Sequence, residues 1–510
     1  MKKKEKIFLS ALFLVVVLLL INQLGERGLV VTVHDSKKIN VRLDSRSIDD
    51  FLDPTKLKWT LEYIYLDNLT TRLVGYDKAG KYVGRLASNI EVIDKKTFIF
   101  ELSEQFFSDG NRINCVDVKE SFKRAILKGV PHAKPKEFIK GADKLTSFED
   151  EIEGLRCEEG KFVLSLVKPV KEIYYFLQLT DFAIYPPELV KKDILYVKDW
   201  EVNSSGAYKI GLDGENVTLE LNSFSKEITP FSPSQINFNY KKDSKDSLDL
   251  SKFDFGKLKY AEYKNIINVG VDENVFLYGN QTAGILFLSL NSMGVFREHS
   301  VRKKIRNLIH TNLRFSDNEL LTKTYQYFLP GARGYIKDLS LDDFSEKIDA
   351  KLPEVFKIYT VRGMKSYLPN NFKEILGEAL GIPVEIEFEE NYKNFSVNSH
   401  KKNYDAIVMS ASMSYKVLAE ALNMIYNAEP REAFDPTKNI NKLLEEYSYS
   451  MSEDKDEEII RKILEQMTED AEIIPLFYQP SADFYNTDKL DVSDLYLTES
   501  MQFWKLKLKE

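Results

Sequence analysis

Residues 97–126 constrain the fold of this chain more than any other segment, because they encode a strand, a turn and a helix in immediate succession. Phe98, Phe100 and Leu102 fall on every second position, which is typical of a half-buried strand. A Ser-Asp-Gly turn sequence follows, and its Gly110 can take a positive φ that a side chain would resist. We therefore expect the chain to reverse direction after this strand.

A capped helix is expected after the turn. Asn114 is a good N-cap residue, and Asp117 can act as its capping-box partner near the positive end of the helix dipole. One helical face then carries the apolar side chains of Val118, Phe122, Ala125 and Ile126. This strand, turn and helix closely resemble the segment tF-L-gv-FsDG-pv-A-DV-fSf-R of the bacterial family 5 extracellular solute-binding proteins. Members of that family are the periplasmic or cell-surface receptors of oligopeptide, dipeptide and nickel ABC importers.

The resemblance continues in order along most of the chain. Residues 53–54 resemble the family's early LDP loop, and residues 203–208 resemble its GTGPY turn, with one glycine kept and the proline missing. Residues 285–291 and 301–305 are similar to the strand and helix that open the second lobe. Residues 469–476 resemble the edaPiiPL ending. Several ordered motifs are far more specific than any one of them.

The resemblance implies an α/β architecture: the two-lobed periplasmic-binding-protein fold, type II and cluster C-like, with an extra subdomain inserted in the first lobe. In the second lobe, strands expected at 357–361, 384–388 and 404–409 alternate with a helix that ends at Gly381, which favours a mainly parallel sheet. The expected divisions are 1–28 for a signal peptide or signal anchor, 29–55 for the first part of lobe I, 56–170 for the inserted subdomain, 171–270 for the second part of lobe I, 271–474 for lobe II, and 475–510 for the C-terminal return to lobe I.

Composition argues against a nucleic-acid partner. The chain has 71 basic and 79 acidic residues and a net charge of −8, whereas polyanion-binding surfaces usually show a basic excess or stripe. No such stripe follows the first six residues. The 43% of hydrophobic residues can fill the large cores of a folded protein.

The N-terminus has the pattern of an export signal. Four lysines among the first six residues precede an apolar run at 7–21, shorter than the roughly 20 residues of a spanning helix. Residues 22–28 offer no clean small-x-small cleavage site, so cleavage and retention as an anchor both stay open. No cysteine ends the run, where a lipoprotein would carry its lipid. We expect a periplasmic protein, soluble or tethered by an uncleaved N-terminal signal anchor.

The two cysteines, Cys115 and Cys157, allow one disulfide. An oxidising compartment permits the bridge. The alternative is a buried thiol at a helix start and an unrelated thiol in a turn, because spacing alone does not fix the distance between two Cα atoms.

Chemistry for catalysis is hard to find. The five histidines show no HExxH spacing and no pairing near cysteine, so no metal site is expected. The sequence also lacks the motifs GxSxG, GxxxxGK[ST] and GxGxxG, which usually indicate acyl transfer, nucleotide hydrolysis and dinucleotide cofactors. Adjacent acids such as Glu389 and Glu390 point apart in a strand, so solvated charge is the better interpretation. We expect a protein that is not an enzyme and has no cofactor.

The resemblance places a ligand site in a cleft between the lobes. In the family that cleft gathers residues near the LDP motif, the turn after a Tyr-Asp strand start, and the aromatic residues after Ile-Pro-Leu. The matching positions here are Asp50, Phe51, Ser410, Ala411, Ser412, Ser414, Tyr415, Phe477 and Tyr478. For Phe51, Phe477 and Tyr478, a place in the core is the alternative that stays open.

The function implied is capture of a small, peptide-like ligand by a monomer and its delivery to an inner-membrane ABC permease. One alternative is a signal-anchored sensor or chaperone-like module of the same fold without transport. A periplasmic hydrolase is the alternative from another class.

The residues after the Tyr-Asp strand start lead to a prediction about the ligand. In peptide-binding members an acid there pairs with the free α-amino group of the ligand, whereas this chain has Ala411 and Ser414, and a serine cannot form that charge-assisted bond. N-acetylation of a peptide-like ligand should therefore cost less than the roughly 2 to 5 kcal/mol of a truncated buried charge pair. Calorimetric titration of matched free and acetylated ligands measures this cost. A loss larger than about 100-fold, or about 2.7 kcal/mol, would mean that another acid, with Asp50 and Asp405 the first to substitute, anchors the amino group.

Overall fold

The structure is a computed structural model, and the residues that it describes are 37–43, 52–56, 60–77, 81–130, 133–213, 216–240, 250–258, 260–269, 273–291, 294–315, 321–330, 335, 341–390, 394–395, 398, 403–411, 439–450, 452–493 and 502–509. None of the helices in this part of the chain combines the length and hydropathy needed to cross a bilayer. The expected signal at 1–28 lies outside the described residues.

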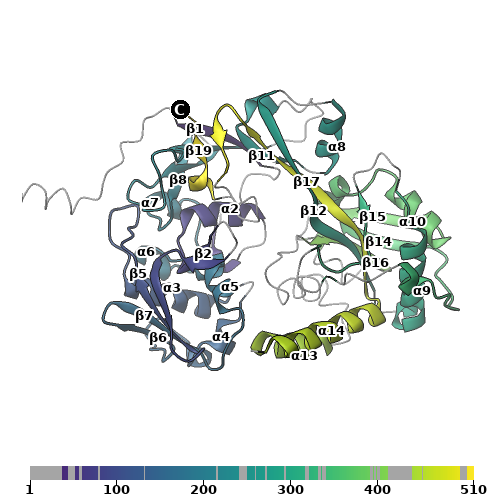
Figure 1. Ribbon diagram of the computed structural model, residues 1–510, viewed down its shortest axis with the longest axis horizontal. Coiled ribbons are helices and arrows are strands. Elements are labelled where there is room, and N and C mark those ends of the chain that lie inside the picture. Colours follow the sequence, from purple (N-terminus) through teal and green to yellow (C-terminus); the bar gives the residue numbers. More distant parts are fainter. Residues whose placement is uncertain are drawn as a thin grey trace, which may run out of the picture.

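One large sheet runs through both lobes of the molecule (Figure 1). Its strand order is β15-β14-β16-β12-β17-β11-β1-β10-β9-β8, and β13 also pairs with β17. The bounds are β1 Lys38–Leu43, β8 Tyr208–Asp213, β9 Asn216–Leu221, β10 Gln235–Tyr240, β11 Phe255–Leu258, β12 Val275–Leu290, β13 Thr322–Lys323, β14 Phe356–Val361, β15 Val384–Glu389, β16 Ala406–Ala411 and β17 Ile473–Asn486.

Two long antiparallel strands, β12 and β17, connect the lobes (Figure 1). At one end β17 pairs with β11 of lobe I, and at the other end β12 pairs with β16 of lobe II. Their ladder shifts register between Asn280 and Gly284 of β12, opposite Pro480 of β17. Proline has no N–H to donate, so the ladder is interrupted midway between the lobes.

Lobe I has a core built from three distant stretches of sequence, 39–69, 183–255 and 490–506. Trp200 is fully buried in this core. Phe503 and Trp504, near the C-terminus, pack in the same core. Besides the sheet, this lobe contains η1 Pro54–Lys56, α2 Thr60–Leu69, α6 Pro187–Val190, α7 Asp199–Val202, η4 Leu250–Lys252, α8 Tyr260–Val269, β18 Leu490–Asp491, η9 Phe503–Lys505 and β19 Lys507–Leu508.

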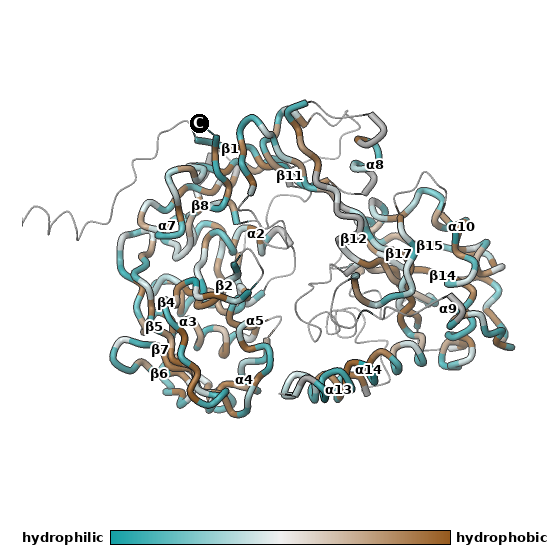
Figure 2. Tube along the Cα trace, viewed as in Figure 1, coloured by the Kyte–Doolittle hydropathy of each residue, from teal (hydrophilic) through white to brown (hydrophobic). Residues whose placement is uncertain are grey.

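Residues 73–184 form a second core next to the first. Four antiparallel strands in the order β4-β5-β7-β6 pack against α3, and the apolar residues gather along this sheet in Figure 2. The elements are β2 Val74–Tyr76, β3 Tyr82–Gly84, β4 Ala87–Val92, β5 Thr97–Leu102, α3 Cys115–Lys128, α4 Pro135–Phe138, η2 Ala142–Lys144, β6 Leu155–Glu158, β7 Lys161–Ser165, α5 Ile173–Gln178 and η3 Thr180–Phe182.

The strand, turn and capped helix expected at 97–126 are confirmed. Phe98 and Phe100 of β5 point into the core, and Gly110 has a φ of 86°. The Asn114 side chain accepts hydrogen bonds from the backbone N–H groups of residues 116 and 117, and Asp117 accepts one from the Asn114 backbone at 2.8 Å. The capping box therefore fixes where α3 begins.

Lobe II corrects one expectation. β14 is parallel to β15 and β16, as the alternation of strands and helices predicted, and α10 ends at Gly381 in the left-handed conformation. The sheet is not mainly parallel, however, because β12 enters this lobe and β17 leaves it, and both pair antiparallel with their neighbours. The helices are η5 Gly294–Arg297, α9 His299–Asn312, η6 Leu341–Phe344, η7 Arg362–Tyr367, α10 Phe372–Leu380, α13 Asn439–Tyr449 and α14 Glu453–Asp470.

The disulfide that the sequence left open is formed. Cys115, the first residue of α3, is bonded to Cys157 of β6, and their Cα atoms are 5.8 Å apart. The bond ties the helix of the second core to an edge strand of its sheet.

Loss of this disulfide should lower the free energy of unfolding by about 4 kcal/mol, because the bond closes a loop over a sequence separation of 42 and restricts the unfolded chain. Urea unfolding of the wild type with and without reductant measures the effect. The double variant Cys115→Ala/Cys157→Ala is the control, and reductant should not change its midpoint. An equal midpoint for the reduced and oxidised wild type would contradict the prediction.

Candidate functional site

Several residues expected at the ligand site lie outside the described residues. These are Asp50, Phe51, Ser412, Ser414 and Tyr415. Their contact with a ligand stays a prediction.

Ser410 and Ala411 end strand β16 beside the interruption of the crossing strands. The Ser410 hydroxyl donates a hydrogen bond to the side-chain oxygen of Gln479 on β17. Gln479 is itself paired with Gly284, the first residue of β12 after the register shift. The carboxyl end of β16 therefore lies where the two lobes join, as a site between lobes requires.

Phe477 and Tyr478 lie on opposite faces of β17. Phe477 is fully buried in the lobe II core, with its ring centroid 5.1 Å from that of Phe315 and 6.4 Å from that of Phe372. Tyr478 is 6% exposed and packs in a second core with Ile285 of β12. Both side chains are thus buried in cores of lobe II, and their contact with a ligand stays a prediction.

Asp405, considered above as another possible anchor for an amino group, lies at the wrong end of β16. Its carboxylate accepts a hydrogen bond from the backbone N–H of Lys357 at 2.8 Å. Ala411 lies six positions further along the strand, which is about 20 Å in an extended chain. Burial raises the pKa of its carboxyl group, and the Lys357 hydrogen bond opposes this rise. Asp405 orders the start of the strand and does not face the carboxyl end.

The acid of the LDP motif, Asp53, connects lobe I to the second core. One carboxylate oxygen accepts hydrogen bonds from Arg124 Nη2 at 2.6 Å and from the Leu195 N–H at 3.0 Å. The other accepts from the N–H and hydroxyl of Thr55, at 2.9 and 2.8 Å. Asp53 and Arg124 have fully buried side chains, so the motif's acid has a structural role.

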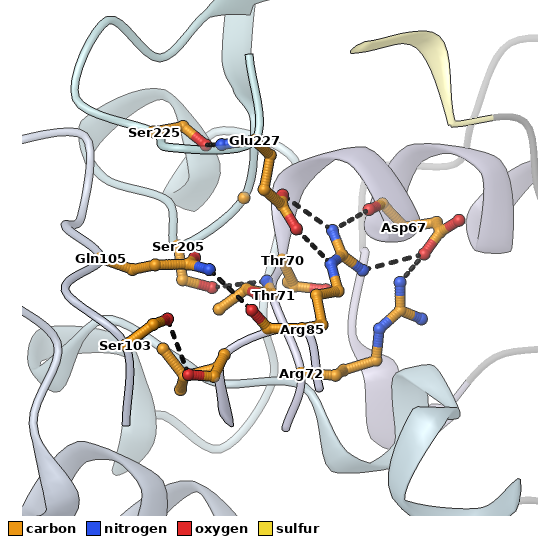
Figure 3. A network of polar contacts seen from close by, with 12 residues as sticks. Asp67, Thr70, Thr71, Arg72, Arg85, Ser103, Gln105, Ser205, Ser225 and Glu227 are labelled. Atoms are coloured by element: carbon orange, nitrogen blue, oxygen red, sulfur yellow. Dashed lines mark hydrogen bonds and ion pairs between the residues drawn. The ribbon is translucent and has the colours of Figure 1, made fainter. Parts of the chain in front are cut away.

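Sequence reasoning missed a buried charge cluster that links α2, the β3–β4 turn and residue 227 (Figure 3). Arg85 binds both carboxylate oxygens of Glu227, with Nη2 to Oε2 at 3.0 Å, and its Nη1 lies 3.4 Å from Asp67 Oδ1. Arg72 also pairs with Asp67, and both guanidinium groups point at that carboxylate in Figure 3. Burial is the main cause that lowers the pKa of Arg72 well below its usual value, and the nearby Arg85 cation lowers this pKa further.

The cluster fixes the positions of α2, the β3–β4 turn and the segment around residue 227 relative to one another. The Arg85 guanidinium carbon lies 4.6 Å from the ring centroid of Trp504, so the cluster also contacts the C-terminal segment. Arg85 and Glu227 are 142 residues apart, and no local motif signals such a pair.

No group of three or more histidine, cysteine or acidic residues that could hold a metal ion occurs among the described residues.

Comparison with known proteins supports the fold. No family model and no curated protein matches this chain. The oligopeptide-binding protein OppAIV of Borrelia burgdorferi is 18% identical with a TM-score of 0.74, over 93% of this chain and all of that one. Haemophilus influenzae OppA in complex with the peptide RPPGFSPFR is 16% identical with a TM-score of 0.72, over 94% of this chain and all of that one. Staphylococcus aureus NikA in complex with Ni(L-His)2 is 13% identical with a TM-score of 0.69, over 93% of this chain and all of that one.

At these identities the likeness establishes the fold. The α/β, two-lobed periplasmic-binding-protein architecture expected from the ordered motifs is confirmed. Two of the compared proteins are in complex with different ligands, a peptide and a nickel complex, so the fold by itself does not select one.

The buried pair of Asp53 and Arg124 gives a prediction about stability. Asp53→Asn should lower the free energy of unfolding by about 3 to 5 kcal/mol, because it leaves the buried Arg124 without its anionic partner. The matched control is Asp193→Asn, which removes the exposed partner of Lys128 on the same helix and should change the free energy of unfolding much less, because solvent screens exposed ion pairs. Urea unfolding compares the two variants. An Asp53→Asn variant no less stable than the control would contradict a structural role for this acid.

Proposed function

We propose that this protein captures a small, peptide-like solute between its two lobes in the periplasm and delivers it to an ABC importer in the inner membrane. The observation that carries the proposal is the joint made by β12 and β17, which connects two separately packed lobes and has a register shift midway between them. Rigid lobes on such a joint close around a ligand by a hinge motion. In this proposal the protein works as a monomer without a cofactor.

The ligand class rests on the ordered motifs and on the ligands of similar structures. OppA of H. influenzae is in complex with a nine-residue peptide sequence and S. aureus NikA with nickel bound to L-histidine. Both ligands contain amino-acid groups, which supports a peptide-like ligand for this chain. Ser410 and Ala411, at the joint of the lobes, are the described residues that support a site there.

The proposal includes the division of the chain into a signal at 1–28 and lobes with the boundaries given above. The separate cores support the division, because the first uses sequence on both sides of the second. In this proposal residues 56–170 form the inserted subdomain, although α2 packs in the first core and the observed second core runs from residue 73 to residue 184.

Two other functions remain as outcomes of experiment. A sensor or chaperone-like module of the same fold would bind a ligand and close, but it would not pass the ligand to a permease. A periplasmic hydrolase would convert a bound candidate to product.

Binding of the true ligand should close the lobes. Native mass spectrometry of the purified protein identifies small molecules that copurify with it. The most abundant of these molecules is then removed and titrated back. A ligand that contacts both lobes binds the closed form better, so the radius of gyration from X-ray scattering should fall while the melting temperature rises with ligand concentration. A saturating ligand that changes neither would contradict the proposed function, and its turnover would identify an enzyme.

A further inference from the structure

The two lobes touch at a second place, away from the crossing strands. Helices α13 and α14 form a hairpin on lobe II, and its turn reaches the second core beside α4 and α5 (Figure 1). The contact segment of that core is residues 166–172, which connect β7 to α5. Neither the ordered motifs nor the proposed hinge accounts for this contact.

Lys171 enters the hairpin from the opposite lobe. Its backbone N–H donates a hydrogen bond to the carbonyl oxygen of Ser448, 3.1 Å away, and its ammonium group forms an ion pair with the carboxylate of Asp456. The ammonium also lies 4.9 Å from the ring centroid of Tyr447. Asp456 is 1% exposed and Tyr447 fully buried, so Lys171 reaches a site formed by both helices of the hairpin.

Lys168 and Tyr449 make a second, more exposed contact beside the first. The Lys168 ammonium lies 3.1 Å from the ring centroid of Tyr449 and 3.8 Å from a carboxylate oxygen of Glu445. Tyr449 belongs to the hairpin but packs against the core of residues 73–184. The lobes thus exchange side chains: two lysines extend toward the hairpin and one tyrosine extends back.

Each half of this contact is part of a rigid unit. Tyr447 packs in the same core as Ile285 of β12 and Tyr478 of β17, so the hairpin moves with lobe II. Its helices alternate hydrophobic and hydrophilic residues along their length, as Figure 2 shows. On the other side, the backbone of Val167 donates to the Phe138 carbonyl at 2.8 Å, which fixes the lysine segment to α4.

The chemistry of the contact suits reversible opening. Lysine and aspartate attract one another in a partly dehydrated site, but both regain water when the lobes separate. The loss of attraction is therefore offset in part by hydration, unlike the separation of two apolar surfaces. A cation over an aromatic ring adds attraction without a fixed bonding geometry.

We propose that Lys168 and Lys171, together with Tyr447, Tyr449 and Asp456, form an interlobe latch that must release before the lobes open. The latch lies on the side of the molecule away from the β12–β17 joint, so it restricts opening even when no ligand is bound. Its role in retaining a ligand rests on the proposed function, but the restriction of opening does not.

Charge exchange tests the latch in the full chain. Lys171→Glu and Asp456→Lys each place like charges together and should lengthen the distance between the lobes without ligand. The double variant Lys171→Glu/Asp456→Lys restores opposite charges and should return most of the wild-type distance. Lys191→Glu is the matched control, because Lys191 pairs with the exposed Glu149 within one lobe. It should leave the interlobe distance unchanged.

Spin labels measure this distance directly. Both native cysteines are in the disulfide, so Lys134→Cys and Arg461→Cys introduce the two thiols that take the labels. Their native side chains are 76% and 63% exposed, and they lie in the second core region and on α14. With a ligand identified, Lys171→Glu should also raise its dissociation rate constant about tenfold, with the double variant near wild type.

Wild-type distances in both single variants, or no recovery in the double variant, would overturn the latch. If a charge exchange prevents folding, Lys168→Ala and Lys171→Gln replace it, since neither adds a charge, and both should shift the distances in the same direction by less. Unchanged distances in this second pair would likewise overturn the proposal. Ligand-induced closure in such variants would leave the proposed function standing, whereas longer distances with no ligand ever found would support the latch alone.

Discussion

The pairing of β12 with β17 is the interaction on which the rest of the architecture depends. The ladder runs from Val275 and Asn486 in lobe I to Ser289 and Ile473 in lobe II. Each strand is therefore a structural member of both lobes, and the core of lobe II could not keep its place without it. The ladder shifts register twice, between Asn280 and Gly284 opposite Pro480 and again between Leu286 and Phe287. Proline donates no ladder hydrogen bond, so we expect the lobes to bend relative to each other at the shift opposite Pro480.

Buried charges set the geometry of lobe I and its neighbouring core. Asp53 holds Arg124 across the boundary between the two cores, and Arg85 holds Glu227 and Asp67 along the lobe I wall. Such pairs contribute little net stability compared with apolar packing, but a wrong arrangement leaves a charge without a partner. They therefore favour one placement of the surrounding loops, including the LDP segment that leads to the expected site.

Local patterns predicted the structure where local interactions decide it. The capping box at Asn114 and the left-handed Gly381 are examples, since each depends on neighbours within a few residues. Ordered motifs extended this to the two-lobed fold. They did not predict the antiparallel pairing in lobe II, because β12 and β17 are far apart in sequence and their direction depends on how the chain passes between lobes. Phe477 shows why the site residues could not be predicted as well. An aromatic residue in a buried strand gives the same sequence pattern whether its side chain faces a core or a ligand.

Hydrogen exchange with and without the copurifying ligand tests the central claim most directly, since that claim is capture between two lobes. The account predicts slower exchange on binding in segments of both lobes at their joint, including residues 279–285 and 477–481 and the chain before residue 52, while the disulfide-linked sheet keeps its exchange rates. Protection confined to one lobe, or absent at the joint, would contradict capture between the lobes.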